Sequence, residues 1–192
     1  MIHPTRWIQA LCAALCLNTA VALAAAPAAT PNPNDACLMC HSAADAKGSS
    51  GKSIAVDGAK FGASVHGELK LKCTDCHADV SAEKLPHAEK LKPVNCATCH
   101  EKAVKEYTGT VHGVARKGGN TVAATCTDCH GSHDIARAKG ADSRTNHANV
   151  EATCGKCHGN DAIVAKAKLP GGNVASTFHD SIHGKALQGA AQ

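Results

Sequence analysis

Apolar residues are concentrated in one stretch of this 192-residue chain, close to its N-terminus. The stretch covers residues 8–22, is rich in Ala and Leu, and follows the positive charge of Arg6. It runs into Ala22-Leu23-Ala24, a small-x-small pattern, which predicts an export signal over residues 1–24 that is cleaved after Ala24. An uncleaved membrane anchor is the alternative, and the polar residues and weakly apolar alanines of the stretch argue against it.

After the signal, the pattern predicts short helices in much irregular backbone. Three prolines within residues 25–34 indicate a flexible or polyproline spacer. The best helical stretches are residues 101–107 and 161–168; Asn160 or Asp161 opens the second, and residues 170–172 end it. Residues 48–51 and 117–120 are rich in turn formers. No later segment approaches the roughly 20 apolar residues that cross a bilayer.

The composition predicts a chain that cannot build an ordinary core. Hydrophobic residues make up 44% of the sequence, but aromatics only 2%, and much of the apolar share is alanine. Once the signal is removed, the aromatics are Phe61, Tyr107 and Phe178. Burial of such small side chains could hardly offset the entropy lost on ordering the backbone.

Five C-x-x-C-H sequences account for every cysteine after the signal. This is the attachment pattern of c-type haem: two thiols each bond one vinyl group, and the histidine that follows is the proximal ligand of the iron. We therefore expect five covalent haems. The cysteines are Cys37, Cys40, Cys73, Cys76, Cys96, Cys99, Cys126, Cys129, Cys154 and Cys157, and the proximal ligands are His41, His77, His100, His130 and His158.

Other uses of paired cysteines explain this pattern less well. Zinc would need the dithiols in pairs, and five do not pair evenly. A thioredoxin-like site needs a strand beside the motif, and no alternating run of strand type is present there. A disulfide scaffold usually joins cysteines that are distant in sequence.

A second pattern, aromatic-x-x-[ST]-[VI]-H-G, ends at His66-Gly67, His112-Gly113 and His183-Gly184. It alternates with the cysteine motifs and defines a two-haem module. Each module contains an odd-numbered haem motif, this segment, an even-numbered haem motif and a trailing histidine. The expected modules cover residues 35–92 and 93–150, followed by a half module over residues 151–192.

Histidine is the expected distal ligand of every iron. Methionine is nearly excluded, because Met1 leaves with the signal and Met39 lies inside the first motif. We expect His183 to close the haem at Cys154 or a neighbouring one. Two histidines, His147 and His179, are left as spares. The five expected distal ligands are His66, His87, His112, His133 and His183.

Ligation by two histidines has two consequences. It gives a lower potential than ligation by histidine and methionine, and it leaves no position on the iron where a substrate could bind.

The balance of charged residues indicates no further function. Lys and Arg number 20 against 16 Asp and Glu, and no interleaving of basic and aromatic residues indicates nucleic-acid binding.

The motifs, the Ser-Val-His-Gly and Ser-Ile-His-Gly segments, and residues 126–135 resemble the multihaem c-type cytochromes of anaerobic respiration, the cytochrome c3/c7 and NapC/NirT-like group. The resemblance implies a mainly α, small multihaem fold around a core of packed haems. It implies a periplasmic, secreted or cell-surface electron-transfer protein, not an enzyme. The implied partners are a quinol dehydrogenase, a reductase or other cytochromes, with association to a membrane complex as a further possibility.

A multihaem reductase of a small oxyanion such as nitrite is the alternative. Pentahaem nitrite reductases resemble the chain in haem number, but they are much longer and typically have one C-x-x-C-K site with an open iron. The sequence contains no C-x-x-C-K.

Overall fold

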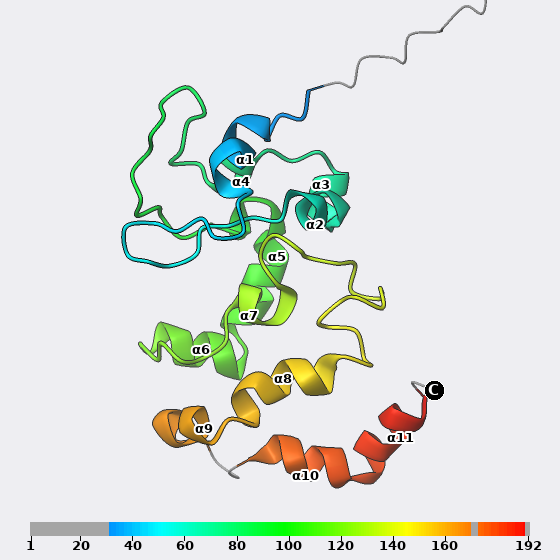
Figure 1. The fold of residues 1–192 in the computed structure, drawn as a ribbon. Helices are drawn as coiled ribbons and strands as arrows, with labels where there is room; N and C mark the ends of the chain where they lie inside the picture. The colour runs from blue at the N-terminus through cyan, green and yellow to red at the C-terminus, as the bar shows by residue number, and fades with distance from the viewer. Residues whose placement is uncertain (1–30, 170–172, 191–192) are drawn as a thin grey trace, which may run out of the picture. The chain divides into compact units, whose positions relative to one another are not determined.

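The computed structural model describes residues 31–169 and 173–190, and the predicted signal lies outside them. Within these ranges the chain forms short helices joined by irregular loops (Figure 1). No strand forms there beyond an isolated antiparallel bridge between Lys47 and Ser53. The prediction of a mainly α fold is confirmed. The helices are α1 Asp35–His41, α2 Gly58–Ala63, α3 Val65–Glu68, α4 Cys73–Cys76, α5 Ala97–Thr108, α6 Val111–Lys117, α7 Cys126–His130, α8 Val150–His158, α9 Asp161–Ala167, α10 Val174–Asp180 and α11 Ile182–Ala190.

Both helices predicted from the sequence are present. The first lies within α5, and the second is α9. The side-chain oxygen of Asn160 accepts a hydrogen bond from the backbone N–H of Ile163 at 3.2 Å, so Asn160 is the N-cap of α9. The helix ends one residue earlier than predicted, because Lys168 adopts the left-handed conformation with φ of 50°. The predicted stop at residues 170–172 lies outside the described residues.

The three aromatic-HG segments fold as the same two-helix corner, α2–α3, α5–α6 and α10–α11. At each corner a Ser or Thr side chain caps the second helix and accepts a hydrogen bond from the backbone N–H of the motif glycine. The distances are 3.1 Å from Gly67 to Ser64, 3.2 Å from Gly113 to Thr110 and 3.1 Å from Gly184 to Ser181. The histidine is therefore the second residue of the capped helix in all three corners.

The motif glycine is required by a close approach of two backbones. A Cβ on Gly67, Gly113 or Gly184 would collide with the carbonyl oxygen of the aromatic residue that begins the segment. We expect Gly67→Ala to destabilise the haem-loaded protein by about 1–3 kcal/mol, the usual cost of overpacking. Denaturant unfolding followed by circular dichroism measures this.

Gly62→Ala is the matched control for Gly67→Ala. Its Cβ would meet nothing within 4 Å in α2. Because alanine favours a helix over glycine by roughly 0.5–1 kcal/mol, Gly62→Ala should be neutral or stabilising. Equal losses of stability in the two variants would contradict the role of the close approach.

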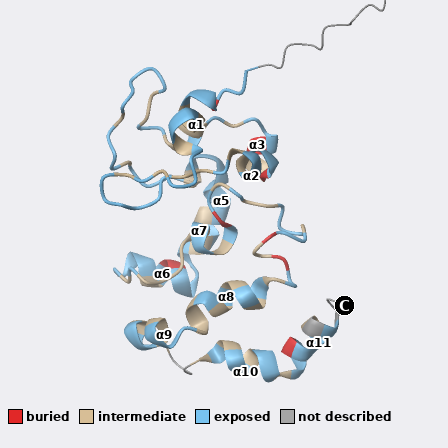
Figure 2. Ribbon diagram, viewed as in Figure 1, coloured by how far each residue is buried: buried red, intermediate tan, exposed pale blue. Residues whose placement is uncertain are grey.

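The described residues contain no buried hydrophobic side chain. Figure 2 shows that most of the described chain is exposed or half-buried, with buried residues at only a few places. The buried polar side chains are those of Asn34, Ser64, Ser143 and Asn146. Asn34, which is 4% exposed, donates to the carbonyl of Leu71 at 3.1 Å and accepts from the N–H of Cys73 at 2.8 Å. Polar contacts of this kind connect segments that have no apolar core between them.

No helix in the described part of the chain is long and apolar enough to span a membrane.

Candidate functional site

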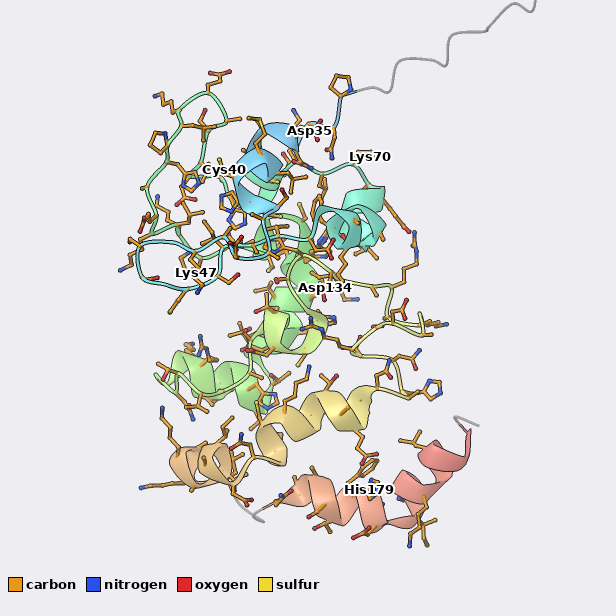
Figure 3. All side chains as sticks on the ribbon, viewed as in Figure 1. Asp35, Cys40, Lys47, Lys70, Asp134 and His179 are labelled. Carbon is orange, nitrogen blue, oxygen red and sulfur yellow. The ribbon has the colours of Figure 1, made fainter. Side chains whose placement is uncertain are left out.

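Each C-x-x-C-H sequence forms a single helical turn. It lies at the end of α1 and α8, makes up the whole of α7, and covers α4 with its histidine just after the helix. In the third motif Cys96 is the N-cap of α5, and the helix is kinked at His100, which has φ of −116° and ψ of 43°. Helical spacing places residues i, i+3 and i+4 on one face, so the two thiols and the histidine of a motif share a side. None of the ten motif cysteines forms a disulfide, including Cys40 of α1, labelled in Figure 3. Thiols without disulfides are what thioether attachment requires.

Neighbouring motifs are in contact through their first cysteines. The thiol of Cys73 is near that of Cys37, and burial together with this neighbour raises the pKa of Cys73 to about 11. The same arrangement recurs between Cys96 and Cys126, where burial and then the Cys126 thiol raise the pKa of Cys96. The first motif therefore lies beside the second, and the third beside the fourth.

The second cysteines of the second and fourth motifs lie near a cysteine of the next motif along the chain. Burial, then the charges of Asp75 and Cys99, raise the pKa of Cys76. Burial and then Cys154 raise the pKa of Cys129. The second motif is thus near the third, and the fourth near the fifth. The five motifs follow one another in space in the order of the sequence.

Four of the five proximal histidines have a second imidazole opposite them. In each pair the ring centroids are 6.0–6.2 Å apart. The pairs are His41 with His87, His66 with His100, His77 with His133, and His112 with His158. In every pair one ring belongs to a C-x-x-C-H motif and the other is one of the histidines predicted to be distal.

This spacing fits an iron between the two rings. An imidazole nitrogen lies about 2 Å from a metal that it binds, so two rings on opposite sides of one metal have centres roughly 6 Å apart. Direct contacts between rings also cover this distance, with centres about 4.5–7 Å apart, so what favours the iron is that every pair joins a motif histidine to a histidine predicted to be distal. The residues present therefore fit a haem with two axial histidines at four of the motifs.

The first pair also has the tautomer that a metal needs. Nδ1 of His41 donates to the carbonyl of Ile54 at 2.8 Å, and Nδ1 of His87 donates to the carbonyl of Ala88 at 2.8 Å. A carbonyl can only accept, so Nδ1 of each neutral ring carries the hydrogen and Nε2 carries the lone pair. Both rings thus have an Nε2 lone pair for binding the metal.

Two loops bring His87 to His41. One joins α1 to α2 and the other joins α4 to α5, and Figure 1 shows both as long segments without helix. The backbone N–H of Ser49 in the first loop donates to the carboxylate of Glu89 in the second at 3.2 Å. Further along the second loop, the N–H of Lys92 donates to Asp79 at 2.6 Å. These bonds fix the segment that contains His87.

The segment after α7 is held in place to set His133 opposite His77. The N–H of Val65 donates to the carbonyl of Ile135 at 2.9 Å, and Arg144 pairs with Asp134 at 2.8 Å. Burial, then the nearby His77, lower the pKa of His133. A lowered pKa favours the neutral imidazole, which is the form that binds a metal. His77 itself has a buried Nδ1 without a hydrogen-bond partner.

The remaining histidines form no ring pair with His130 in the described part of the chain. His147 and His183 are exposed. His179, labelled in Figure 3, contacts Glu151 of α8 through Nδ1 at 2.7 Å. The expectation that His183 closes the haem at Cys154 or a neighbouring one stays a prediction, and it is His112 that lies opposite the histidine of the Cys154 motif, His158.

The aromatic-HG histidines pair across module boundaries, which the sequence did not predict. His66 of the first module lies opposite His100 of the second, and His112 of the second lies opposite His158 of the third. His133 returns from the second module to His77 of the first. No spacing in the sequence indicates which proximal histidine a given distal histidine faces.

Comparison with known proteins supports this reading of the site. Residues 59–131 match the family described as cytochrome c7 and related cytochrome c. The match includes the second, third and fourth motifs and supports a multihaem c-type cytochrome of the c3/c7 type with covalent haem c. Cytochromes c7 are typically periplasmic electron carriers. Searches of curated proteins and of solved structures found no match.

Proposed function

We propose that the chain is an electron-transfer protein with five covalent haems c. It relays electrons between a respiratory donor and a terminal reductase or extracellular acceptor, outside the cytoplasmic membrane. The observation that carries the proposal is the set of four histidine pairs at 6.0–6.2 Å, each with one ring from an attachment motif. When bound, haem supplies an iron that takes up and releases one electron.

The protein's own residues would hold and order these groups. The motif thiols would attach them, and at four motifs the paired imidazoles would bind the iron. The contacts of Cys37 with Cys73 and of Cys96 with Cys126 support a continuous series of neighbouring haems. Axial ligation by two histidines closes the iron to substrates and keeps its potential below that of a histidine–methionine site. These properties are those of an electron relay.

The proposed partners are other redox proteins. By resemblance to the NapC/NirT-like group, they are a quinol dehydrogenase, a reductase or another cytochrome. The chain would associate with a membrane complex through such a partner after its signal has been removed. Cleavage after Ala24 and a periplasmic or cell-surface location belong to the same proposal.

Mass spectrometry of the denatured protein tests the proposal. We expect a mature chain that begins at about Ala25 and has five haem additions, because each pair of motif thiols forms two thioether bonds that survive denaturation. Fewer than five additions, or a retained signal, would contradict it.

Carbon monoxide binding separates the relay from the alternative, a reductase of a small oxyanion. A six-coordinate iron with two histidines should not bind carbon monoxide readily, whereas a reductase needs an open iron. Catalytic turnover of nitrite or hydroxylamine together with carbon monoxide binding would favour the reductase.

A further inference from the structure

The two even-numbered motifs, which begin at Cys73 and Cys126, have the same local structure. Both read Cys-Thr-Asp-Cys-His. In each, the motif aspartate accepts a hydrogen bond from the backbone N–H of the residue before the first cysteine, at 2.7 Å in the second motif and 2.6 Å in the fourth. This bond shapes the turn itself, but it does not fix the turn relative to the odd-numbered motif of the same module.

In the first module, Asn34 connects the two attachment motifs. Its backbone carbonyl accepts a hydrogen bond from the N–H of Cys37 at 3.1 Å, at the beginning of α1. Its side chain donates to the carbonyl of Leu71 at 3.1 Å and accepts from the N–H of Cys73 at 2.8 Å. Asn34 is 4% exposed, so these bonds form away from water, where they are stronger. One residue thus holds the first cysteines of both motifs.

In the second module, Tyr107 makes the equivalent bond with a different chemical group. Tyr107 belongs to α5, the helix that begins in the third motif, and its hydroxyl donates to the carbonyl of Ala124 at 2.6 Å. Ala124 precedes Cys126 by two residues, as Leu71 precedes Cys73. In both modules, therefore, a side chain from the helix of the odd motif or from its N-cap bonds the same carbonyl before the even motif. Figure 1 shows α4 next to α1 and α7 next to α5.

The residues that differ between the two modules agree with this equivalence. The second module has Pro93 where the first has Asn34, three residues before the odd motif, and proline has no side-chain donor. In its aromatic-HG corner the second module has Tyr107 where the first has Phe61, which has no hydroxyl. Each module thus contains one donor for the carbonyl, from one of two positions.

We propose that Asn34 and Tyr107 are positioning residues for electron transfer within a module. They act through the even motif: the bond to its carbonyl sets how the haem attached there lies relative to the haem of the odd motif. Electron transfer between two cofactors depends on their separation and orientation, which the protein controls through such supporting contacts. The inference rests on the proposed function and names the residues that order two of its haem pairs.

Soret circular dichroism of the haem-loaded protein tests the proposal, because the coupling between neighbouring porphyrins depends on their distance and relative orientation. Tyr107→Phe removes the hydroxyl and keeps the ring. It should alter the coupled Soret signal, while mass spectrometry finds five haems and far-ultraviolet circular dichroism finds the helices unchanged. Asn34→Ala should alter the Soret signal as well.

Asn146→Ala is the matched control for Asn34→Ala. Asn146 is also buried, but its side chain bonds backbone groups of its own loop, such as the carbonyl of Gly140 at 3.0 Å. This variant should melt at a lower temperature and keep the Soret signal of the wild type. The comparison separates a loss of stability from a change in the placement of the haems.

Proteins that lack one even haem assign each effect to its pair. Where alanines replace the two cysteines of the second motif, Asn34→Ala should no longer change the Soret signal, whereas Tyr107→Phe still should. Where they replace the two cysteines of the fourth motif, the result should be reversed. If Asn34→Ala itself attaches only four haems, Asn34→Asp takes its place, because it keeps the acceptor for the N–H of Cys73 and loses the donor to Leu71.

Two results would overturn the inference and leave the proposed function intact. One is a Soret signal that is unchanged in Tyr107→Phe or in the Asn34 variant while five haems are attached. The other is a change that persists after the even haem of that module has been removed. Fewer than five haems in the wild-type protein would instead contradict the proposed function.

Discussion

Apoprotein made without haem-attachment machinery should be disordered, and this is the largest effect that we expect. The described residues bury no hydrophobic side chain, and the mature sequence has only three aromatics. Ordering a backbone costs roughly 1–2 kcal/mol per residue, which the polar contacts present here cannot offset. Folding should therefore be coupled to attachment of the cofactor, as it is to metal binding in zinc fingers.

Far-ultraviolet circular dichroism of the apoprotein measures this effect. We expect a spectrum of unfolded chain without a cooperative thermal transition, whereas the haem-loaded protein should melt cooperatively. The matched control is the same chain with haem attached, at the same concentration and pH. A cooperative melt of the apoprotein would contradict the prediction and imply a core that the composition does not reveal.

Local structure was predictable from the sequence wherever a few neighbouring residues determine it. The helix of residues 161–167 follows from the cap at Asn160, and the turns at Gly51 and Gly119 have φ of 75° and 90°. The attachment turns follow from the C-x-x-C-H spacing. The recurring Ser/Thr and Gly of the aromatic-HG segments were visible as a pattern, but their roles as cap and close-approach residue became clear only from the corner geometry.

The partners of the distal histidines were not predictable in this way. Which rings face each other depends on contacts between segments distant in sequence, such as the bond from Val65 to Ile135 and the bonds of Asn34 to Leu71 and Cys73. From closeness in the chain, the sequence predicted that His183 faces the fifth motif or a neighbouring one. In the structure the ring opposite the histidine of the fifth motif is that of His112, from the preceding module.

The position of histidines from one module opposite the motif of the next has a consequence for stability. Because His66 and His112 each face the proximal histidine of the following module, a haem bound between such a pair would connect two modules. Loss of a distal ligand should therefore loosen a module boundary and open an iron at the same time. Variants of these histidines should consequently have larger effects than the half-buried position of His66 and the exposed position of His112 suggest.

The second large effect is expected for His112→Ala, which should open the iron of the fifth motif and not that of its own module. The ring of His112 lies 6.1 Å from His158, so its removal leaves that haem without a distal ligand. The variant should gain one high-spin haem in five and one equivalent of carbon monoxide binding. It should also melt at a lower temperature than the wild type, because a contact between two modules is lost.

A variant protein that lacks the fifth haem shows which iron His112→Ala opens. In a protein with Cys154→Ala and Cys157→Ala, shown by mass to have four haems, His112→Ala should add no carbon monoxide binding, because its haem is no longer attached. His66→Ala is the matched control: it lies in an equivalent corner but faces His100 at 6.0 Å, so it should open an iron equally in both backgrounds. If His112→Ala opened an iron in the four-haem protein, the pairing of His112 with His158 would be wrong. The second module would then not supply a distal ligand to the third.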